Sequence, residues 1–212
     1  MSDGLNMPAL TRDLQRQNEA TGTGALPAGN GPGRLLDASA GSITRILLAV
    51  SEYGAETFAT AVQSVLRGLP GKARLDILVS PGALDTVSGW LAASGPGALA
   101  CLIEAPDDLS FSLWTQDAFL ARSDGTLLIP PHLERYQDHT AAILLAKGAD
   151  LEAKQAPLYF EGGNMIAAGD LLLIGEDSIV QGGGDLPGFQ AAIDPTRRPV
   201  VLGTDLDLGG ET

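Results

Sequence analysis

The feature that most constrains the fold of this chain is an alternation of short apolar runs with helix-like stretches in its first half. Apolar runs of strand length occupy residues 44–50, 74–80 and 99–104. Between the first two, residues 55–69 place their apolar side chains on one helical face. After the second run, Pro81 begins a predicted helix that continues to about residue 93. This order predicts an α/β fold in which helices cover a sheet.

The remainder of the chain contains shorter elements between a glycine-rich start and an acidic end. We predict strands at 126–130, 157–161, 165–168, 171–174 and 200–202, and helices at 133–147 and 186–193. Residues 1–42 are rich in Gly, Ala, Asn, Thr and Pro and lack a periodic apolar face. We therefore expect a disordered N-terminal tail over 1–42 and one folded domain over 43–212.

The charge of the chain narrows the classes of partner. It has 13 Lys and Arg against 26 Asp and Glu, a formal net charge of −13. Such a surface repels nucleic acid and anionic membranes and attracts cations, although many acidic proteins are simply soluble. No apolar stretch reaches the length of a membrane span, and the N-terminus lacks the pattern of a secretory signal. We expect a cytoplasmic protein that could form a homo-oligomer.

Metal and cofactor sites are not predicted. Cys101 is the only cysteine, which excludes an internal disulfide and a multi-cysteine zinc site, and its apolar surroundings predict a buried, unreactive thiol. No phosphate-binding loop of the P-loop type occurs in the sequence. The acidic residues near the C-terminus lack the spacing of a helix-loop-helix calcium site.

The most informative segment is LYFEGGNMIAAGDLLLI, residues 158–174. A predicted strand leads into Glu161, which is followed by Gly162, Gly163 and Asn164. Paired glycines allow a sharp turn and a close approach of a ligand. A carboxylate fixed at such a turn could orient a histidine or bind a cation. Alternatively, the glycines only make a hairpin turn and Glu161 lies in solvent.

A second segment, Trp114-Thr115-Gln116-Asp117, precedes an apolar stretch. A carboxylate beside a tryptophan suits a planar cation, because the acid accepts paired hydrogen bonds and the ring offers a face. The alternative is that Trp114 packs on the core and Asp117 caps a turn.

Taken together, these two segments resemble those of the guanidino-group modifying, or pentein, superfamily. That superfamily includes arginine, agmatine and peptidyl-arginine deiminases, dimethylarginine hydrolases and amidinotransferases. Its members carry an Arg-Asp segment, often Trp-x-Arg-Asp, and later a Glu-Gly-Gly-Asp or Glu-Gly-Gly-Asn segment. The matching segments here are Trp114–Asp117 and Glu161–Asn164, and the resemblance extends over about residues 44–205.

The resemblance implies an α/β propeller of ββαβ modules, of which this chain would form about three of five. It implies that Asp117 grips the substrate guanidinium and that Glu161 pairs with a catalytic histidine. Trp114, Gln116 and Asn164 would complete the substrate-binding residues. A cysteine would attack the guanidinium carbon and water would resolve the intermediate, without a cofactor.

The sequence also departs from the family pattern. Gln116 stands where the family has arginine, and neither a His-x-Asp motif nor a cysteine follows Glu161. We expect the sequence to be the front part of a longer protein. His132 and His139 precede Glu161 and suit a helix or loop surface, and Cys101 is not assigned as the nucleophile.

Three functions therefore remain open. The first is a hydrolase, specifically a deiminase, that acts on a small guanidino compound or arginine derivative, with this chain supplying the carboxylate part of the site; amidino transfer is the less favoured reaction. The second is a non-catalytic module that binds a cationic ligand or partner. The third is an acidic α/β domain without a site.

Overall fold

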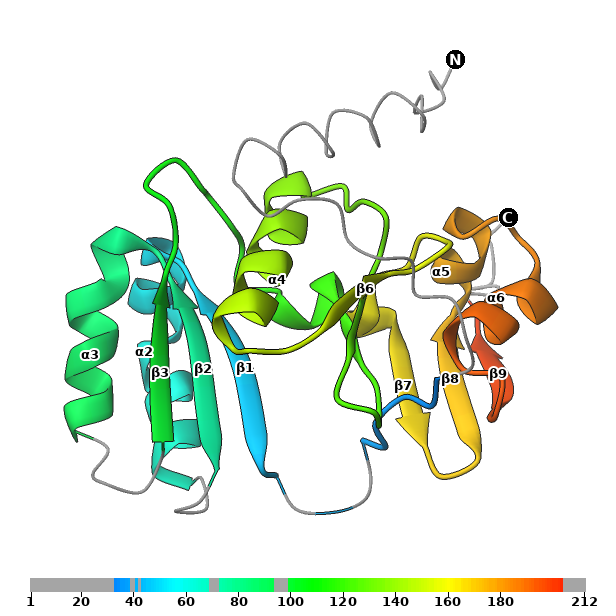
Figure 1. Cartoon of the computed structure of the whole chain (residues 1–212), viewed down its shortest axis with the longest axis horizontal. Helices are drawn as coiled ribbons and strands as arrows, with labels where there is room; N and C mark the ends of the chain where they lie inside the picture. Colours follow the sequence, from blue (N-terminus) through cyan, green and yellow to red (C-terminus); the bar gives the residue numbers. More distant parts are fainter. Residues whose placement is uncertain (1–32, 39–40, 42, 69–72, 94–98, 204–212) are drawn as a thin grey trace, which may run out of the picture.

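Three small β-sheets form the frame of the chain, and they stand side by side in Figure 1. The computed structural model describes residues 33–38, 41, 43–68, 73–93 and 99–203. Within these residues each sheet has 3 strands, in the orders β1-β2-β3, β4-β5-β6 and β7-β8-β9. The α/β class predicted from the sequence is confirmed.

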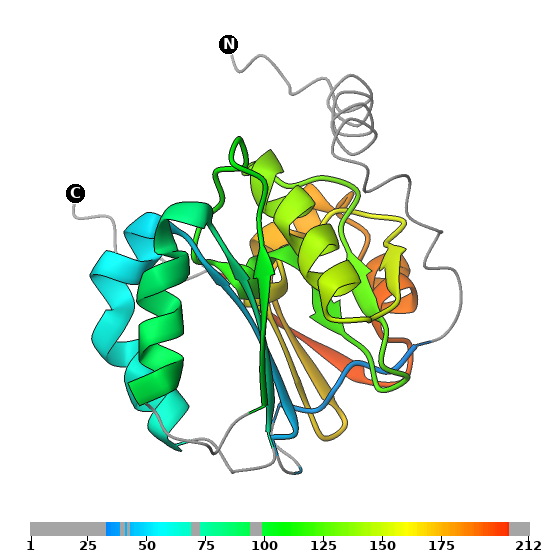
Figure 2. The same ribbon diagram turned by 60° about the vertical axis from the view of Figure 1, so that its left-hand side comes forward.

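The first sheet is entirely parallel and follows the alternation seen in the sequence. Its elements are β1 (Arg45–Val50), α2 (Glu52–Gly68), β2 (Arg74–Val79), the short 3-10 helix η1 (Pro81–Ala83), α3 (Leu84–Ala93) and β3 (Leu99–Glu104). Helices α2 and α3 lie together on one face of this sheet (Figure 2). The central strand β2 is buried on both faces, which explains why it is a continuous apolar run.

The second and third sheets share a strand–strand–helix–strand order. The second contains β4 (Leu120–Ala121), β5 (Leu127–Ile129), α4 (Tyr136–Gly148) and β6 (Ala153–Gln155). The third contains β7 (Met165–Ala168), β8 (Leu171–Gly175), α5 (Glu176–Gln181), α6 (Leu186–Ile193) and β9 (Arg198–Leu202). In both, the first two strands pair antiparallel and the last two pair parallel. The ββαβ order expected from the resemblance thus occurs in the second sheet, and in the third sheet with two short helices in place of one.

Helices between the sheets join them through shared apolar contacts. On one side of α4, Ala141 and Leu145 pack with Leu78 of the first sheet. On its other side, Ile143 packs with Ile129 of the second sheet. Helix α6 likewise joins the second and third sheets in one cluster. This packing holds the segments that connect the sheets in fixed positions.

The structure corrects several sequence predictions. Strands β4 and β6 and helix α5 were not predicted, because elements this short contain too few residues to show a period. Residues 157–161, predicted as a strand, belong to none.

Residues 33–38 were predicted to be part of the disordered tail, but they pack against the sheets. Leu35 is buried, Leu36 N–H donates to the Ala121 carbonyl at 2.8 Å, and Ala38 N–H donates to the Ala167 carbonyl at 2.8 Å. These bonds to strand residues offset the cost of ordering the segment. Residues 1–32 of the predicted tail lie outside the described residues.

Among the described residues, no helix combines the length and the apolar character that a membrane crossing requires.

Candidate functional site

Two short 3-10 turns, η2 (Thr115–Ala118) and η3 (Gly162–Asn164), meet in the structure. A Cβ atom on Gly162 would collide with the backbone oxygen of Gln116. A Cβ on Gly163 would collide with Oδ1 of Asp117. The paired glycines therefore do more than make a turn, because they allow the Asp117 segment to approach the Glu161 segment.

Asp117 is held by a network of charged side chains. Its Oδ2 accepts a hydrogen bond from Nη2 of Arg135 at 2.7 Å. Arg135 Nε donates to Oδ2 of Asp138 at 2.8 Å. The buried Asp138 also accepts from the backbone N–H and the hydroxyl of Ser112, each at 2.6 Å. Although burial acts to lower it, the pKa of Arg135 is raised, because Asp138 and Asp117 both stabilise the guanidinium.

Glu161 is held by neutral donors instead. The Tyr159 hydroxyl donates to Oε1 at 3.1 Å, and Nδ2 of Asn164 donates to Oε2 at 3.4 Å. The Tyr159 ring contacts the ring of His132, with centroids 5.0 Å apart. Burial, followed by the negative charge of Glu161, raises the pKa of the Tyr159 hydroxyl, so Tyr159 remains a neutral donor.

Both histidines are buried, which corrects the expectation of a surface position. His132 is 6% exposed and His139 is 3% exposed. His139 Nε2 donates to the Pro130 carbonyl at 2.9 Å. Burial lowers the pKa of His132, and it lowers that of His139 to about 4, so both rings are neutral at pH 7. In the described part of the chain, neither ring hydrogen-bonds Glu161.

The other predicted site residues are accessible. Trp114 is 59% exposed, so the alternative in which it packs on the core is wrong. Gln116 and Asn164 are also exposed, and Asp117 and Glu161 are half-buried. Trp114 and Gln116 line a groove of about 590 Å³ between β1 and the β4–β5 hairpin. The five predicted residues are thus placed on or directly beside the two contacting turns.

Cys101 lies apart from this arrangement. Cys101 is on β3, which is separated from β1 by the central strand β2. The turn η2 lies instead at β1, where the Ala49 N–H donates a hydrogen bond to the Thr115 hydroxyl at 2.9 Å. The thiol is partly exposed rather than buried, because an edge strand is covered less completely. Across the described residues, no group of three or more His, Cys, Asp and Glu side chains has the arrangement of a metal site.

Four residues of this region were not predicted from the sequence: Ser112, Arg135, Asp138 and Tyr159. Two signals were available. Arg135 and Asp138 are spaced i,i+3 at the start of a predicted helix, a spacing at which side chains meet. Tyr159 and Glu161 are two apart in an extended segment, a spacing that puts side chains on one face.

Comparison with known proteins identifies the fold. No protein-family model matches the sequence, and no curated protein matches it by sequence. By structure, the chain is similar to agmatine deiminase from C. jejuni, with a TM-score of 0.55 and 10% sequence identity. The two share a fold. The match covers 82% of this chain and 55% of the deiminase, so the chain spans about half the length of that protein.

Proposed function

We propose that this chain belongs to the guanidino-group modifying superfamily and supplies the carboxylate part of a deiminase site. One observation carries the proposal: a guanidinium, that of Arg135, already lies on Oδ2 of Asp117 at 2.7 Å. This ion pair supports a role for Asp117 as an acceptor of charge-assisted hydrogen bonds from a guanidinium. The similarity of fold to an agmatine deiminase supports the same conclusion.

The reaction in this proposal is hydrolysis at the guanidinium carbon of a small guanidino compound or arginine derivative. Water supplies the oxygen of the ureido product, and one nitrogen leaves as ammonia. Asp117 would hold the N–H groups of the guanidinium, and the exposed ring of Trp114 would lie against its face. Asn164 and the half-exposed carboxylate of Glu161 would lie on the turn opposite.

The nucleophile and the proton carrier must come from residues other than the cysteine and histidines seen here. Cys101 lies on the far edge of the first sheet, His139 is hydrogen-bonded to Pro130, and His132 is buried against Tyr159. In our proposal the thiolate and imidazole are brought to the turns by a further polypeptide segment. The net charge of −13 favours the approach of a cationic substrate.

Calorimetric titration of the chain tests the binding step. We expect agmatine, arginine and arginine amide to bind more tightly than putrescine, an amine that lacks the guanidinium. Asp117→Asn and Glu161→Gln should each weaken agmatine binding by about tenfold or more, since a hydrogen bond to a charged group contributes about 1.5–3 kcal/mol. Asp177→Asn, which changes an exposed carboxylate on α5, is the matched control and should leave binding unchanged.

Ammonia release from the same compounds tests the chemical step. Release that Asp117→Asn abolishes would establish the deiminase. Binding without release, by a preparation that includes every segment of the natural protein, would favour the non-catalytic module. If no guanidino compound binds, or if Asp117→Asn leaves the affinity unchanged, the proposal is wrong.

A further inference from the structure

One wall of the groove beside Trp114 and Gln116 is the unpaired edge of strand β1. In the order β1-β2-β3, strand β1 pairs with β2 on one side only. Three residues of β1, Arg45, Leu47 and Leu48, line the groove, whose volume of about 590 Å³ lies in the range of roughly 300–1,000 Å³ typical of binding sites. The opposite wall comes mainly from apolar side chains of the β4–β5 hairpin and of the segment that precedes it.

The backbone groups of β1 alternate between those that pair with β2 and those that face the groove. At the end of the strand, the Val50 carbonyl accepts a hydrogen bond from the Ser80 N–H at 3.1 Å. In a parallel pair such bonds recur at every second residue of a strand, so the even-numbered residues of β1 are the ones that bond to β2. The N–H and C=O groups of Arg45, Leu47 and Ala49 therefore point away from β2.

This free edge is only partly provided with partners. The Ala49 N–H donates to the hydroxyl of Thr115, another residue that lines the groove, at 2.9 Å. The N–H and C=O groups of Leu47 have no hydrogen-bond partner among the described residues. Residues 45–49 are half-buried, so water reaches these groups incompletely. Backbone groups left unpaired in such surroundings are unfavourable, and a further strand along the edge would pair them.

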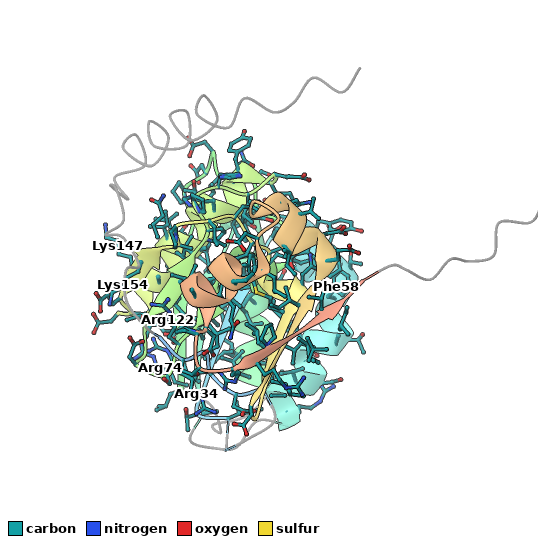
Figure 3. The ribbon with its side chains drawn as sticks, turned by 90° about the vertical axis from the view of Figure 1, so that its right-hand side faces the viewer. Arg34, Phe58, Arg74, Arg122, Lys147 and Lys154 are labelled. Carbon is teal, nitrogen blue, oxygen red and sulfur yellow. The ribbon has the colours of Figure 1, made fainter. Side chains whose placement is uncertain are left out.

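The opposite wall shows how the chain completes a free strand edge. A segment that ends at Leu36 runs antiparallel along β4. The Leu36 N–H donates to the Ala121 carbonyl, and the Ser123 N–H donates to the Arg34 carbonyl, each at 2.8 Å. This pairing brings Arg34 near Arg122 of the hairpin, and Figure 3 shows both arginines on the same side of the molecule. An extended backbone thus already lies along one wall of the groove.

The groups of that segment that face away from β4 also have partners. The Leu35 N–H donates to Oδ2 of Asp194, and the Leu35 carbonyl accepts from Nη1 of Arg197, both at 3.0 Å. For Leu47, no side chain of the described residues takes this role. The outer strand β3 differs again, because three of its six residues are exposed and water reaches its free edge. The contrast favours a further backbone as the partner of Leu47.

We propose that the free edge of β1 binds an extended peptide segment of a partner protein by strand addition. A peptide backbone supplies the alternating N–H and C=O groups that pair with Leu47, whereas an apolar small molecule supplies neither. The mainly apolar walls favour a segment with small or β-branched apolar side chains, since an unpaired charge would be costly there. Because Thr115 already occupies the Ala49 N–H, about four residues of peptide fit along the edge, at about 3.3 Å per residue. This site recognises a backbone, so it is independent of the guanidinium site proposed at Asp117 and Glu161.

Tryptophan fluorescence tests the proposal, because Trp114 lines the groove and is 59% exposed, whereas Trp90 is buried in the first-sheet core. The probe is the neutral peptide acetyl-Ser-Val-Ala-Val-Ser amide, which contains no aromatic residue. The control peptide has the same side chains, but a methyl group replaces the hydrogen of each backbone N–H. We expect a saturable emission change with the probe and binding of the control that is about tenfold weaker or more, since several hydrogen bonds are lost. The absence of a saturable change, or equal affinity for the two peptides, would overturn the proposal.

Substitutions at Leu47 locate the peptide on β1. Leu47→Pro removes the N–H that faces the groove but no bond to β2, and proline is accepted at such edge positions. Leu47→Ala removes the same side chain and keeps the N–H, so it is the matched control. We expect Leu47→Pro to bind the probe peptide about fivefold more weakly than Leu47→Ala, or weaker still. Equal affinities of the two variants would contradict the proposal.

Hydrogen exchange followed by NMR gives the same test without a substitution, should Leu47→Pro not fold. Saturation with the probe peptide should slow exchange of the Leu47 N–H at least about tenfold, because that group becomes hydrogen-bonded. The Leu48 N–H, which already bonds to β2, is the control and should change little. Unchanged exchange at Leu47 would overturn the proposal.

A second copy of the chain is the competing occupant of this edge. Sedimentation velocity of the chain without peptide distinguishes it, and we expect the natural chain, Leu47→Ala and Leu47→Pro to sediment alike. A dimer of the natural chain and of Leu47→Ala that Leu47→Pro dissociates would assign the edge to a second copy and overturn the peptide proposal.

Discussion

The two turns of the candidate site each present a carboxylate, but one carboxylate has a charged partner and the other has neutral partners. Asp117 is backed by charges, because Arg135 binds it and Asp138 in turn binds Arg135. Glu161 is backed by uncharged groups, because Tyr159 and Asn164 donate to it and the buried ring of His132 lies behind Tyr159. The negative charge of Glu161 is therefore not neutralised by these partners, whereas that of Asp117 is shared with an arginine.

This difference indicates how a guanidinium would meet the site. At Asp117 an incoming cation competes with Arg135, whose side chain is 41% exposed. At Glu161 it meets a carboxylate that neutral hydrogen bonds hold in place. The charged half of the site, at Asp117, should respond to salt. The hydrogen bonds of the neutral half, at Glu161, should respond to salt much less.

The contact between the two halves can be broken at Gly162. We expect Gly162→Ala to lower the free energy of unfolding by about 3 kcal/mol, because its Cβ meets backbone oxygens of Gln116 and Phe119 that cannot rotate away. Urea denaturation measures the change. In the control Gly89→Ala, within α3, the new Cβ has no atom within 4 Å, and stability should rise by up to about 1 kcal/mol. Equal effects of the two substitutions would mean that the turns do not need close contact.

Acid should destabilise the folded chain through the buried His139. Its pKa is about 4 in the folded protein against an ordinary value of 6.5, so between these values the unfolded chain binds more protons than the folded chain. The stabilisation is complete above pH 6.5 and declines as the pH falls toward 4, by about 2 kcal/mol between pH 7.5 and pH 5. Urea denaturation at both pH values, compared with His139→Gln, isolates this contribution. A variant with the same pH dependence as the natural protein would exclude His139 as its source.

A substitution at Tyr159 tests whether neutral hydrogen bonds hold Glu161. Tyr159→Phe deletes the hydroxyl that donates to Glu161 and should cost about 1 kcal/mol of unfolding free energy. Because no charge is lost, the difference should persist in high salt. Urea denaturation at low and high salt provides the measurement, and a cost that disappears in salt would show that Glu161 is held by charge.

The smallest effect on stability is expected at Arg135. Arg135→Gln breaks the ion pairs with Asp117 and Asp138, while Ser112 still donates two hydrogen bonds to Asp138. The loss should be less than about 1 kcal/mol at low salt, and smaller at high salt. The same variant should bind agmatine several-fold more tightly by calorimetry, since the competing guanidinium is gone. Weaker binding would instead place Arg135 among the groups that hold the ligand.

Local patterns explain which parts of the fold were predictable. Strands β1, β2 and β3, together with β7, β8 and α6, each contain enough apolar residues to show a period or a buried run. Strands β4 and β6 have two and three residues, and only their hydrogen bonds to β5 define them. The short segment at Leu35 was missed for the same reason, since its order depends on bonds to strands distant in the sequence.

By itself, the sequence determined the α/β alternation, the acidic charge and the two short motifs that contain Asp117 and Glu161. These properties depend on residue type and near neighbours along the chain. Tertiary structure alone decided that Gly163 lies against Asp117, that Arg135 binds Asp117, and that His132 and His139 are buried. The physical reason is that burial and partner choice depend on contacts between residues far apart in the chain, which no local pattern records.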